Sequence, residues 1–217
     1  MKTILSLVIL FAASHTTFAA EQTYSITTPV AHKTGIEFKI PYTMGTHEGE
    51  AQEVRGSVIL DLVQPSAIKG SFLVPIQGLK TGNNTRDCHL VEALGINYTQ
   101  SKFPKDHVCD SDDKLPIAGP DSVVYPNVEF KVTALQLTDG KITSIDGEWT
   151  IHGVTLPAHF AVKVTTENEG FRLEATTQLS LEAFQVKVKP ATALGVVIST
   201  VRDTVTVILD LHFQAVK

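Results

Sequence analysis

Apolar and polar residues alternate with a period of two along most of this chain, and this limits what it can fold into. Neighbouring side chains on a β-strand point to opposite faces, so the pattern is typical of strands with one buried face. The alternating runs lie at residues 36–42, 58–62, 68–76, 128–132, 160–164, 171–175 and 205–213. Turn sequences separate several of them, namely Asp139-Gly140, His152-Gly153 and Glu167 to Gly170. With weaker runs near Tyr24, Trp149 and Leu179, the sequence predicts about eight antiparallel strands or more.

One stretch, residues 84–95, departs from the alternation and has apolar residues spaced four apart, which predicts a short helix. Asn84 is the expected N-cap, which places Asp87 in the first turn, where a negative charge suits the helix dipole. Gly95 provides a stop signal at the other end. The following segment, Ser101–Tyr125, is irregular and rich in Asp and Pro, so we expect a functional or tethered loop.

The first 19 residues have the parts of a secretory signal peptide. Lys2 supplies the positive start, Ile4 to Ala13 the apolar run, and Thr17-Phe18-Ala19 the small-residue cleavage site. The apolar run is too short to span a bilayer, and no later stretch is a candidate for a transmembrane segment. The alternative is a buried N-terminal helix. We expect cleavage near Ala19 and one mature domain over residues 20–217, located in the periplasm or secreted.

The charge of the chain excludes one class of partner. The formal net charge is −5 and becomes −6 when Lys2 is removed with the signal peptide. No cluster of Lys and Arg provides a surface for nucleic acid or for anionic membranes. We therefore expect no nucleic-acid partner.

The two cysteines, Cys88 and Cys109, fall in the predicted helix and in the long loop. In an oxidising compartment a bridge between them is expected, and it would contribute about 3 kcal/mol by closing a loop of about 20 residues. The alternative is a zinc site that adds His89 and His107 as ligands. Adjacent residues such as Cys88 and His89 rarely reach one metal, so we predict a disulfide and no metal.

Antiparallel strands with one helix leave a closed barrel or a sandwich, and the alternation does not say which face is buried. An outer-membrane barrel alternates too, with its apolar side outward. Such a barrel needs aromatic girdles at both membrane interfaces, and four Tyr and one Trp are too few to build them. The sequence therefore disfavours that class.

Two motifs resemble the signatures of the YceI-like family. Residues 81–90, TGNNTRDCHL, are similar to TG-x-x-x-RD-x-HL, and residues 146–157, DGEWTIHGVTLP, are similar to G-x-LT-x-x-GVT-x-P. The spacing between the motifs, the opening strand around Phe38 and the Phe184-Gln185-Val186 piece also match. The resemblance covers nearly the whole mature chain.

The resemblance implies an antiparallel, lipocalin-like β-barrel with one short helix that binds a polyisoprenoid or another long-chain amphipathic lipid, usually in the bacterial periplasm. A barrel of about eight strands can enclose one slender ligand. Burial of the ligand contributes about 0.8 kcal/mol per CH₂, so binding needs no polar contact. We expect non-catalytic lipid binding or transport with no cofactor besides the lipid. The alternatives are an enzyme acting on a bound lipid and a stress-related interaction module; a homodimer stays open.

The chain departs from the family pattern at three places. Leu156 stands where the family often has Lys or Arg, which removes a charge for a headgroup. Ser101–Tyr125 resembles an insertion, because Phe103-Pro104 and Tyr125-Pro126 both match a single aromatic-Pro step. The pair Cys88 and Cys109 is not part of the general signature. These departures affect the mouth of the barrel more than its fold.

Candidate ligand contacts follow from the predicted helix and strands. Arg86 lies in the first helical turn and could clamp a diphosphate or carboxylate, although a structural ion pair with Asp87 or a neighbouring acid is the alternative. His89 could contact the headgroup or bond the loop backbone; it does not face Asp87, since residues two apart on a helix point away from each other. The aromatic residues expected to line the cavity are Phe38, Phe72, Phe130, Trp149 and Phe160.

Overall fold

The computed structural model describes residues 21–27, 35–61, 68–109, 119, 121–193 and 196–217. The signal peptide predicted for residues 1–19 lies outside these residues, and so do residues 110–118 of the long loop. The signal peptide and the domain boundary at residue 20 therefore stay predictions.

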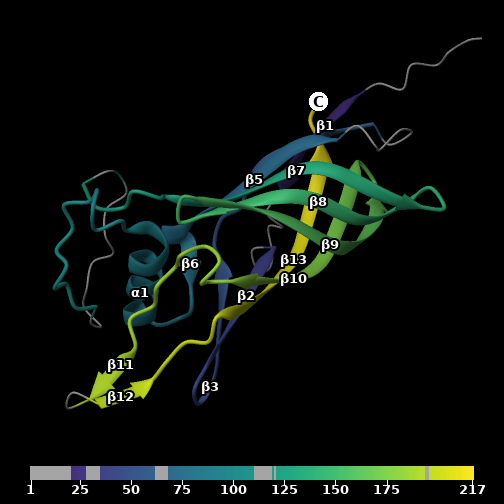
Figure 1. Cartoon of the computed structure of the whole chain (residues 1–217). Coiled ribbons are helices and arrows are strands. Elements are labelled where there is room, and N and C mark those ends of the chain that lie inside the picture. Colours follow the sequence, from purple (N-terminus) through teal and green to yellow (C-terminus); the bar gives the residue numbers. More distant parts are fainter. Residues whose placement is uncertain (1–20, 28–34, 62–67, 110–118, 120, 194–195) are drawn as a thin grey trace, which may run out of the picture.

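Eight antiparallel strands form a closed barrel, which confirms the predicted fold class. Each strand pairs with the next around the barrel, and β1 pairs with β13 to close it (Figure 1). In the order of their pairing, the barrel strands are β1 (Gln22–Thr27), β4 (Arg55–Leu60), β5 (Lys69–Pro75), β7 (Asn127–Thr138), β8 (Lys141–Ile151), β9 (Val154–Glu167), β10 (Gly170–Ser180) and β13 (Thr204–Ala215).

Strand β13 supports two branches of the sheet along one edge. Its C-terminal part pairs with β1, from His212 to Ala215, and its N-terminal part pairs with β2 (Ile36–Tyr42). Strand β2 in turn pairs with β3 (Gly45–Ala51), which pairs with the short β6 (Leu79–Lys80). The branches separate near Asp210, whose backbone N–H donates to the carbonyl of Gly35 at 2.7 Å.

One helix, α1 (Asn84–Gly95), covers the end of the barrel where β2, β3 and β6 lie (Figure 1). It follows the 3₁₀ turn η1 (Ile76–Gly78) and confirms the predicted bounds. Gly95 acts through packing and not through a left-handed stop: a Cβ there would collide with Ile76, and its carbonyl accepts from the N–H groups of Val124 and Tyr125. The end of the long loop is thereby fixed to the helix.

The apolar residues of the alternating strands face the interior. Along β13, buried residues alternate with residues more exposed to solvent from Val205 to Phe213. The turns at Asp139-Gly140 and His152-Gly153 have positive φ at both residues, as tight hairpins require. The inward apolar face is the arrangement of a barrel whose interior is its hydrophobic core.

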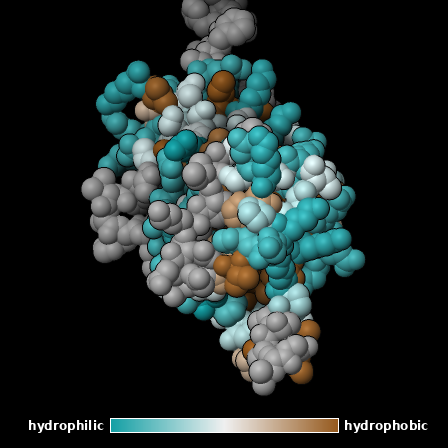
Figure 2. Space-filling model, turned by 90° about the vertical axis from the view of Figure 1, so that its left-hand side faces the viewer, coloured by the Kyte–Doolittle hydropathy of each residue, from teal (hydrophilic) through white to brown (hydrophobic). Residues whose placement is uncertain are grey.

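The strand prediction missed parts of the sheet. β3 carries no apolar alternation, and the run near Leu179 belongs to the same strand as residues 171–175. A small hairpin of β11 (Ala191–Ala193) and β12 (Val196–Ser199) stands apart from the barrel. Its residues Val196 to Ile198 are exposed, and Figure 2 shows hydrophobic atoms at this lowest tip of the molecule.

Gly147 in β8 provides a test of barrel packing, because a Cβ there would meet the ring of Phe130 and the carbonyl oxygen of Lys131 at 2.6 Å. We expect Gly147→Ala to lower the free energy of unfolding by about 1–3 kcal/mol, since the crowded residues must shift. Urea denaturation measures this. The matched control is Gly78→Ala, whose Cβ has no neighbour nearer than 3.9 Å and which should change stability by less than about 0.5 kcal/mol. Equal stabilities for both variants would contradict the packing argument.

Candidate ligand-binding cavity

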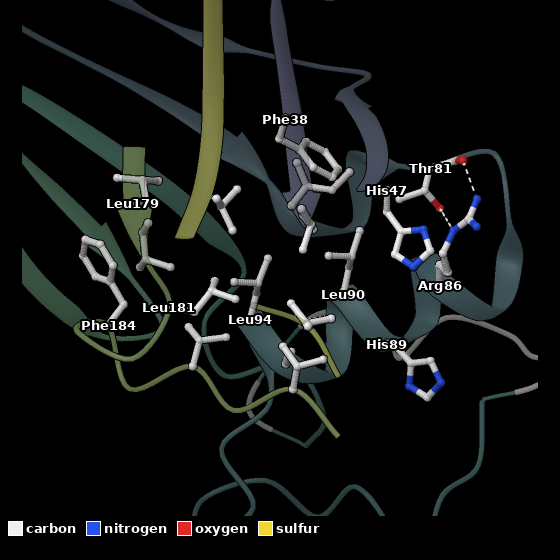
Figure 3. Close-up of a pocket in the computed structure, with 18 of the residues that line it drawn as sticks. Phe38, His47, Thr81, Arg86, His89, Leu90, Leu94, Leu179, Leu181 and Phe184 are labelled. Carbon is white, nitrogen blue, oxygen red and sulfur yellow. Dashed lines mark hydrogen bonds between the residues drawn. The ribbon is translucent and has the colours of Figure 1, made fainter. Parts of the chain in front are cut away.

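A cavity of about 600 Å³ occupies the half of the barrel that β2, β3 and α1 enclose (Figure 3). Its volume lies in the range typical of small-molecule sites. Most of the lining side chains are aliphatic, including Leu90 and Leu94 from the helix and Val205 and Val207 from β13. The helix is amphipathic in the sense the spacing predicted, with its leucines turned toward the barrel.

The segment after β10 forms another wall of the cavity. Leu181, Phe184, Val186 and Val188 all line it, and Phe184 and Val186 are buried. Figure 3 shows Phe184, Leu181 and Leu179 on the opposite side of the cavity from His47 and Arg86. The Phe184-Gln185-Val186 piece therefore closes the cavity, with Gln185 at a positive φ of 58° that turns the chain between its two buried neighbours.

The structure divides the five predicted lining aromatics into two groups. Phe38 and Trp149 line the large cavity. Phe72, Phe130 and Phe160 line a separate space of only about 30 Å³ in the other half of the barrel. Phe130 packs against Trp149 and Phe160, with ring centroids 4.7 and 5.4 Å apart. These rings fill the barrel below the cavity, so the three phenylalanines form its packed base.

Arg86 lies at the polar rim of the cavity, where it is bonded to the loop before the helix. Its Nε donates to Thr81 Oγ1 at 3.2 Å and its Nη2 to the Thr81 carbonyl at 3.1 Å. These two bonds use two of the five N–H donors of a guanidinium. Among the described residues Arg86 forms no ion pair, so the pairing with Asp87 that we considered is not found.

Asp87 is buried and turned toward the loop. Its Oδ1 accepts from the backbone N–H of Thr81 at 2.8 Å and from Thr81 Oγ1 at 2.7 Å, and Lys80 Nζ lies 3.8 Å from Oδ2. The predicted N-cap was wrong by one residue: Asn83, not Asn84, accepts from the N–H of Arg86 at 3.0 Å. Thr81 and Asp87 thus hold the helix start and keep Arg86 in place.

His47, on β3, faces the same rim and was missed by the sequence analysis. Its ring stacks on Tyr42 with centroids 4.0 Å apart. Burial lowers the pKa of His47, and the positive charge of Arg86 lowers it further. The strand that carries His47 has no apolar alternation, so its residues gave no signal of a buried face.

His89 points to a buried carboxylate and not to the loop backbone. Its Nδ1 lies 3.3 Å from Glu92 Oε2, one helical turn away. Glu92 is only 5% exposed, and its Oε1 accepts from Tyr98 at 3.0 Å and from Lys189 at 3.3 Å. A buried carboxylate is costly unless it is paired, and these contacts satisfy it. The spacing of His89 and Glu92, one helical turn apart, could have signalled part of this cluster, whereas Lys189 comes from a distant segment.

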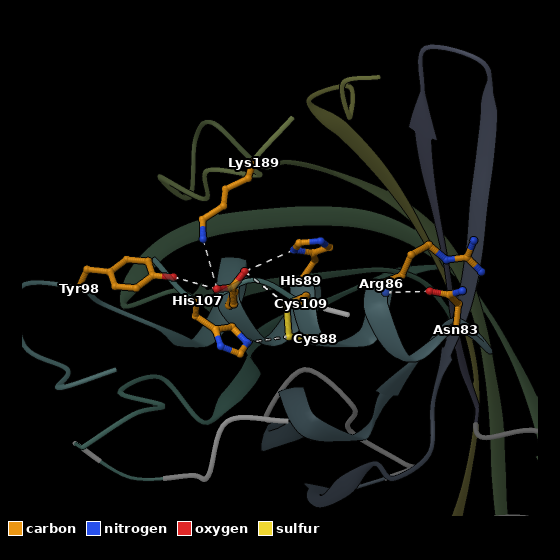
Figure 4. Close-up of a disulfide and its surroundings, with 9 residues drawn as sticks. Asn83, Arg86, Cys88, His89, Tyr98, His107, Cys109 and Lys189 are labelled. Atoms are coloured by element: carbon orange, nitrogen blue, oxygen red, sulfur yellow. Dashed lines mark hydrogen bonds and ion pairs between the residues drawn. A yellow bond between two sulfur atoms is a disulfide. The ribbon is translucent and has the colours of Figure 1, made fainter. Parts of the chain in front are cut away.

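The predicted disulfide between Cys88 and Cys109 is present, with Cα atoms 5.8 Å apart. It ties residues 101–109 of the long loop to the helix, as expected for a tethered segment. His107 Nε2 lies 3.6 Å from Cys88 Sγ, and Glu92 Oε2 lies 3.5 Å from Cys109 Sγ (Figure 4). His89, His107 and Cys109 also line the cavity, so the disulfide forms part of its wall.

Fold and cavity together define the class: an antiparallel barrel, packed in one half and hollow in the other, that can enclose an apolar ligand. Among the described residues, none of the helices has the length and apolar character needed to span a membrane. A family model described as the YceI-like domain matches residues 120–213. This part of the chain is similar to the YceI-like family, whose signatures the two motifs also resemble.

Curated relatives are similar to the chain in sequence, and solved structures are similar to it in fold. A UPF0312 protein of Pseudomonas putida (strain W619) is 28% identical over 177 residues, which are 78% of this chain and 73% of the relative. The fold is similar to that of Burkholderia cenocepacia BcnA, with a TM-score of 0.58 and 14% identity over 83% of this chain and 95% of that one. A polyisoprenoid binding domain from Saccharophagus degradans gives a TM-score of 0.54 and 11% identity over 90% and 99%.

The effect of Arg86 on His47 is directly testable. We expect Arg86→Gln to raise the pKa of His47, because it removes the positive charge that opposes protonation while burial is retained. An NMR titration of the imidazole measures this. The control is Arg172→Gln on the outer face, where Arg172 pairs with Asp210, and it should leave His47 unchanged. An unchanged pKa in Arg86→Gln would contradict the contact.

The same pKa has a consequence for stability. Because the folded state protonates His47 less readily than the unfolded state, His47 does not lower the free energy of unfolding above the unfolded pKa of about 6.5. Below that pH the free energy of unfolding decreases, and the decrease is complete once the pH has fallen through the folded pKa of His47.

Proposed function

We propose that this protein binds one long-chain amphipathic lipid, with the chain in the cavity and the headgroup at the polar rim near Arg86. The observation that carries the proposal is the cavity itself, about 600 Å³ of mainly aliphatic surface, with His47, Thr81, Arg86 and His89 on the side opposite Leu179 and Phe184 (Figure 3). A polar metabolite would leave most of its hydrogen bonds unmade in such a space. A hydrocarbon chain matches it.

Apolar burial is sufficient for useful affinity. At about 0.8 kcal/mol per CH₂, ten buried carbons contribute about 8 kcal/mol before the cost of association. A polyisoprenoid and a fatty-acid-like chain both meet this requirement. The polyisoprenoid binding domain of Saccharophagus degradans, which shares the fold, supports the polyisoprenoid.

The rim favours an anionic headgroup. Arg86 keeps N–H donors beyond the two that bind Thr81, and it has no carboxylate partner among the described residues. A guanidinium binds carboxylate or phosphate bidentately. Asp87, the nearest acid in sequence, is turned to Thr81 and does not compete.

We propose that the activity is binding or transport, not catalysis, and that it takes place in the periplasm or outside the cell. A disulfide supports such a location, since these bonds persist in oxidising compartments. The polar residues of the rim act in this proposal as headgroup contacts and as structural links. A bound lipid needs no further cofactor.

Native mass spectrometry and organic extraction of the purified protein test the proposal. We expect one lipid per chain in the wild type. Ala93→Trp should abolish it, because Ala93 lines the cavity from the helix and an indole there takes the space of the ligand. Ala161→Trp places the same ring on the exposed face of β9 and should retain the lipid. A wild-type protein that carries no stoichiometric lipid and takes none up would overturn the proposal, and so would a lipid retained by a folded Ala93→Trp variant.

The role of Arg86 is tested separately. We expect Arg86→Ala to weaken binding of a diphosphate or carboxylate lipid by about tenfold to a hundredfold, since one charge-assisted contact contributes about 1.5–3 kcal/mol. A neutral lipid of equal length should bind almost as before, because each methylene is still buried. Binding assays with the two lipids measure this difference. Equal losses for both would mean that Arg86 serves only to hold Thr81 and the helix start.

A further inference from the structure

We propose that reduction of the Cys88–Cys109 disulfide creates a zinc site, with Cys88, Cys109 and His107 as ligands and Glu92 as the fourth. The observation is the gathering of these donors around the bridge: Cys88, His107 and Cys109 have ligand atoms within 4.8 Å of one another. A second group, His89, Glu92 and Cys109, meets the same limit and shares Cys109. The inference is independent of the proposed lipid binding.

In each of the two groups, one distance between donor atoms matches tetrahedral zinc. Bonds of about 2.0–2.3 Å to nitrogen, oxygen and sulfur place the ligands of one tetrahedral ion about 3.3–3.8 Å apart. His107 Nε2 lies 3.6 Å from Cys88 Sγ, and Glu92 Oε2 lies 3.5 Å from Cys109 Sγ. The sulfurs, about 2.05 Å apart in a disulfide, need to separate by less than about 2 Å. A second side-chain movement is needed to bring Glu92 into reach of the ion that Cys88 and His107 bind, since Glu92 belongs to the other group.

The carboxylate is already oriented for this role. Tyr98 and Lys189 hold Glu92 Oε1, which leaves Oε2 directed at Cys109 and His89 (Figure 4). Partners of this kind, which fix a ligand from outside the metal shell, are common around zinc. His89 is 43% exposed in its side chain and can turn away from Oε2, which leaves this oxygen to the metal.

The disulfide masks this site in the oxidised protein. A bonded sulfur carries no hydrogen and no charge, so the 3.5 Å approach of Cys109 Sγ to Glu92 Oε2 is a contact and not a hydrogen bond. Thiolates, in contrast, are strong zinc ligands. Cys88 and Cys109 are buried, at 0% and 6% exposure, so a bound ion would be shielded from water.

The redox step is a thiol–disulfide exchange with an external dithiol. The dithiol gives two electrons and two protons to the disulfide, so that Cys88 and Cys109 become thiols and the donor becomes a disulfide. Zinc then displaces the two thiol protons to solvent and binds both thiolates. With neutral His107 and ionised Glu92, the site carries a net charge of −1, next to the positive Lys189.

Cobalt serves as the spectroscopic probe. Full-length mature protein is reduced anaerobically, freed of reductant and titrated with Co²⁺. We expect the visible bands of tetrahedral cobalt and a thiolate charge-transfer band at one ion per chain, both abolished by added Zn²⁺. The oxidised protein should show neither. His107→Ala should weaken binding at least about 100-fold, beyond the 10–100-fold typical of outer partners. His159→Ala, which removes an exposed histidine of the outer face, should bind like the wild type.

Three results would overturn the proposal. The first is a reduced protein that keeps its circular dichroism and shows no thiolate–cobalt band. The second is equal binding by His107→Ala and the wild type. The third is a chain that unfolds on reduction and is not refolded by Zn²⁺. None of these results bears on lipid binding, which is measured in the oxidised protein.

Discussion

The two edges of β13 hold this molecule together. On one edge it pairs with β10 over its whole length, from Gly170↔Gln214 to Ser180↔Thr204. On the other edge it pairs first with β2 and then with β1. One strand thus closes the barrel in one half and opens a second branch in the other. The separation of the two branches makes room for a helix and a cavity where a simple barrel would be packed throughout.

The separation of the two branches also explains why one half of the barrel interior is packed and the other half contains a cavity. In the closed half, aromatic and aliphatic side chains from every wall meet, and only about 30 Å³ stays unfilled. In the branched half the walls stand further apart, and the helix and residues 181–188 supply a lining without filling the space. Trp149 lies between the two halves and packs on Phe72 and Phe130, so the base of the cavity is rigid.

Much of the fold could be predicted from the sequence, because strand alternation and helical spacing are local signals. The strands, the bounds of α1 and the hairpin turns follow from such signals. The closed barrel was implied by the resemblance to the YceI-like family, and the disulfide was expected because two cysteines lie in a chain predicted to reach an oxidising compartment. β3 could not be predicted, since its inward-facing residues are small: Gly49 lies beneath the ring of Phe38, and Ala51 is fully buried beside the two-residue strand β6. The separation of the five aromatic residues into cavity-lining and packed groups could not be predicted either. Alternation indicates which face of a strand a residue lies on, but not its position along the barrel axis.

The candidate site shows the same limit in its polar residues. Arg86 could be placed at the helix start because the motif and the capping sequence are contiguous. His47 and Lys189 could not be associated with it, since they lie far from the helix in sequence and reach it only in the folded barrel. The hydrogen bonds of Arg86 to Thr81 could not be predicted for a different reason. An arginine next to an aspartate in the sequence suggests an ion pair, but Asp87 accepts a hydrogen bond from Thr81 instead.

The packed half of the barrel has a consequence for how anything moves through it. Side chains block one end, so an occupant enters and leaves by the same opening, in opposite order. The end of a ligand that enters last leaves first, and it is the end that stays at the opening of the cavity, accessible to solvent. A barrel that is packed in one half has no continuous channel along its axis, so its interior is a pocket and not a pore.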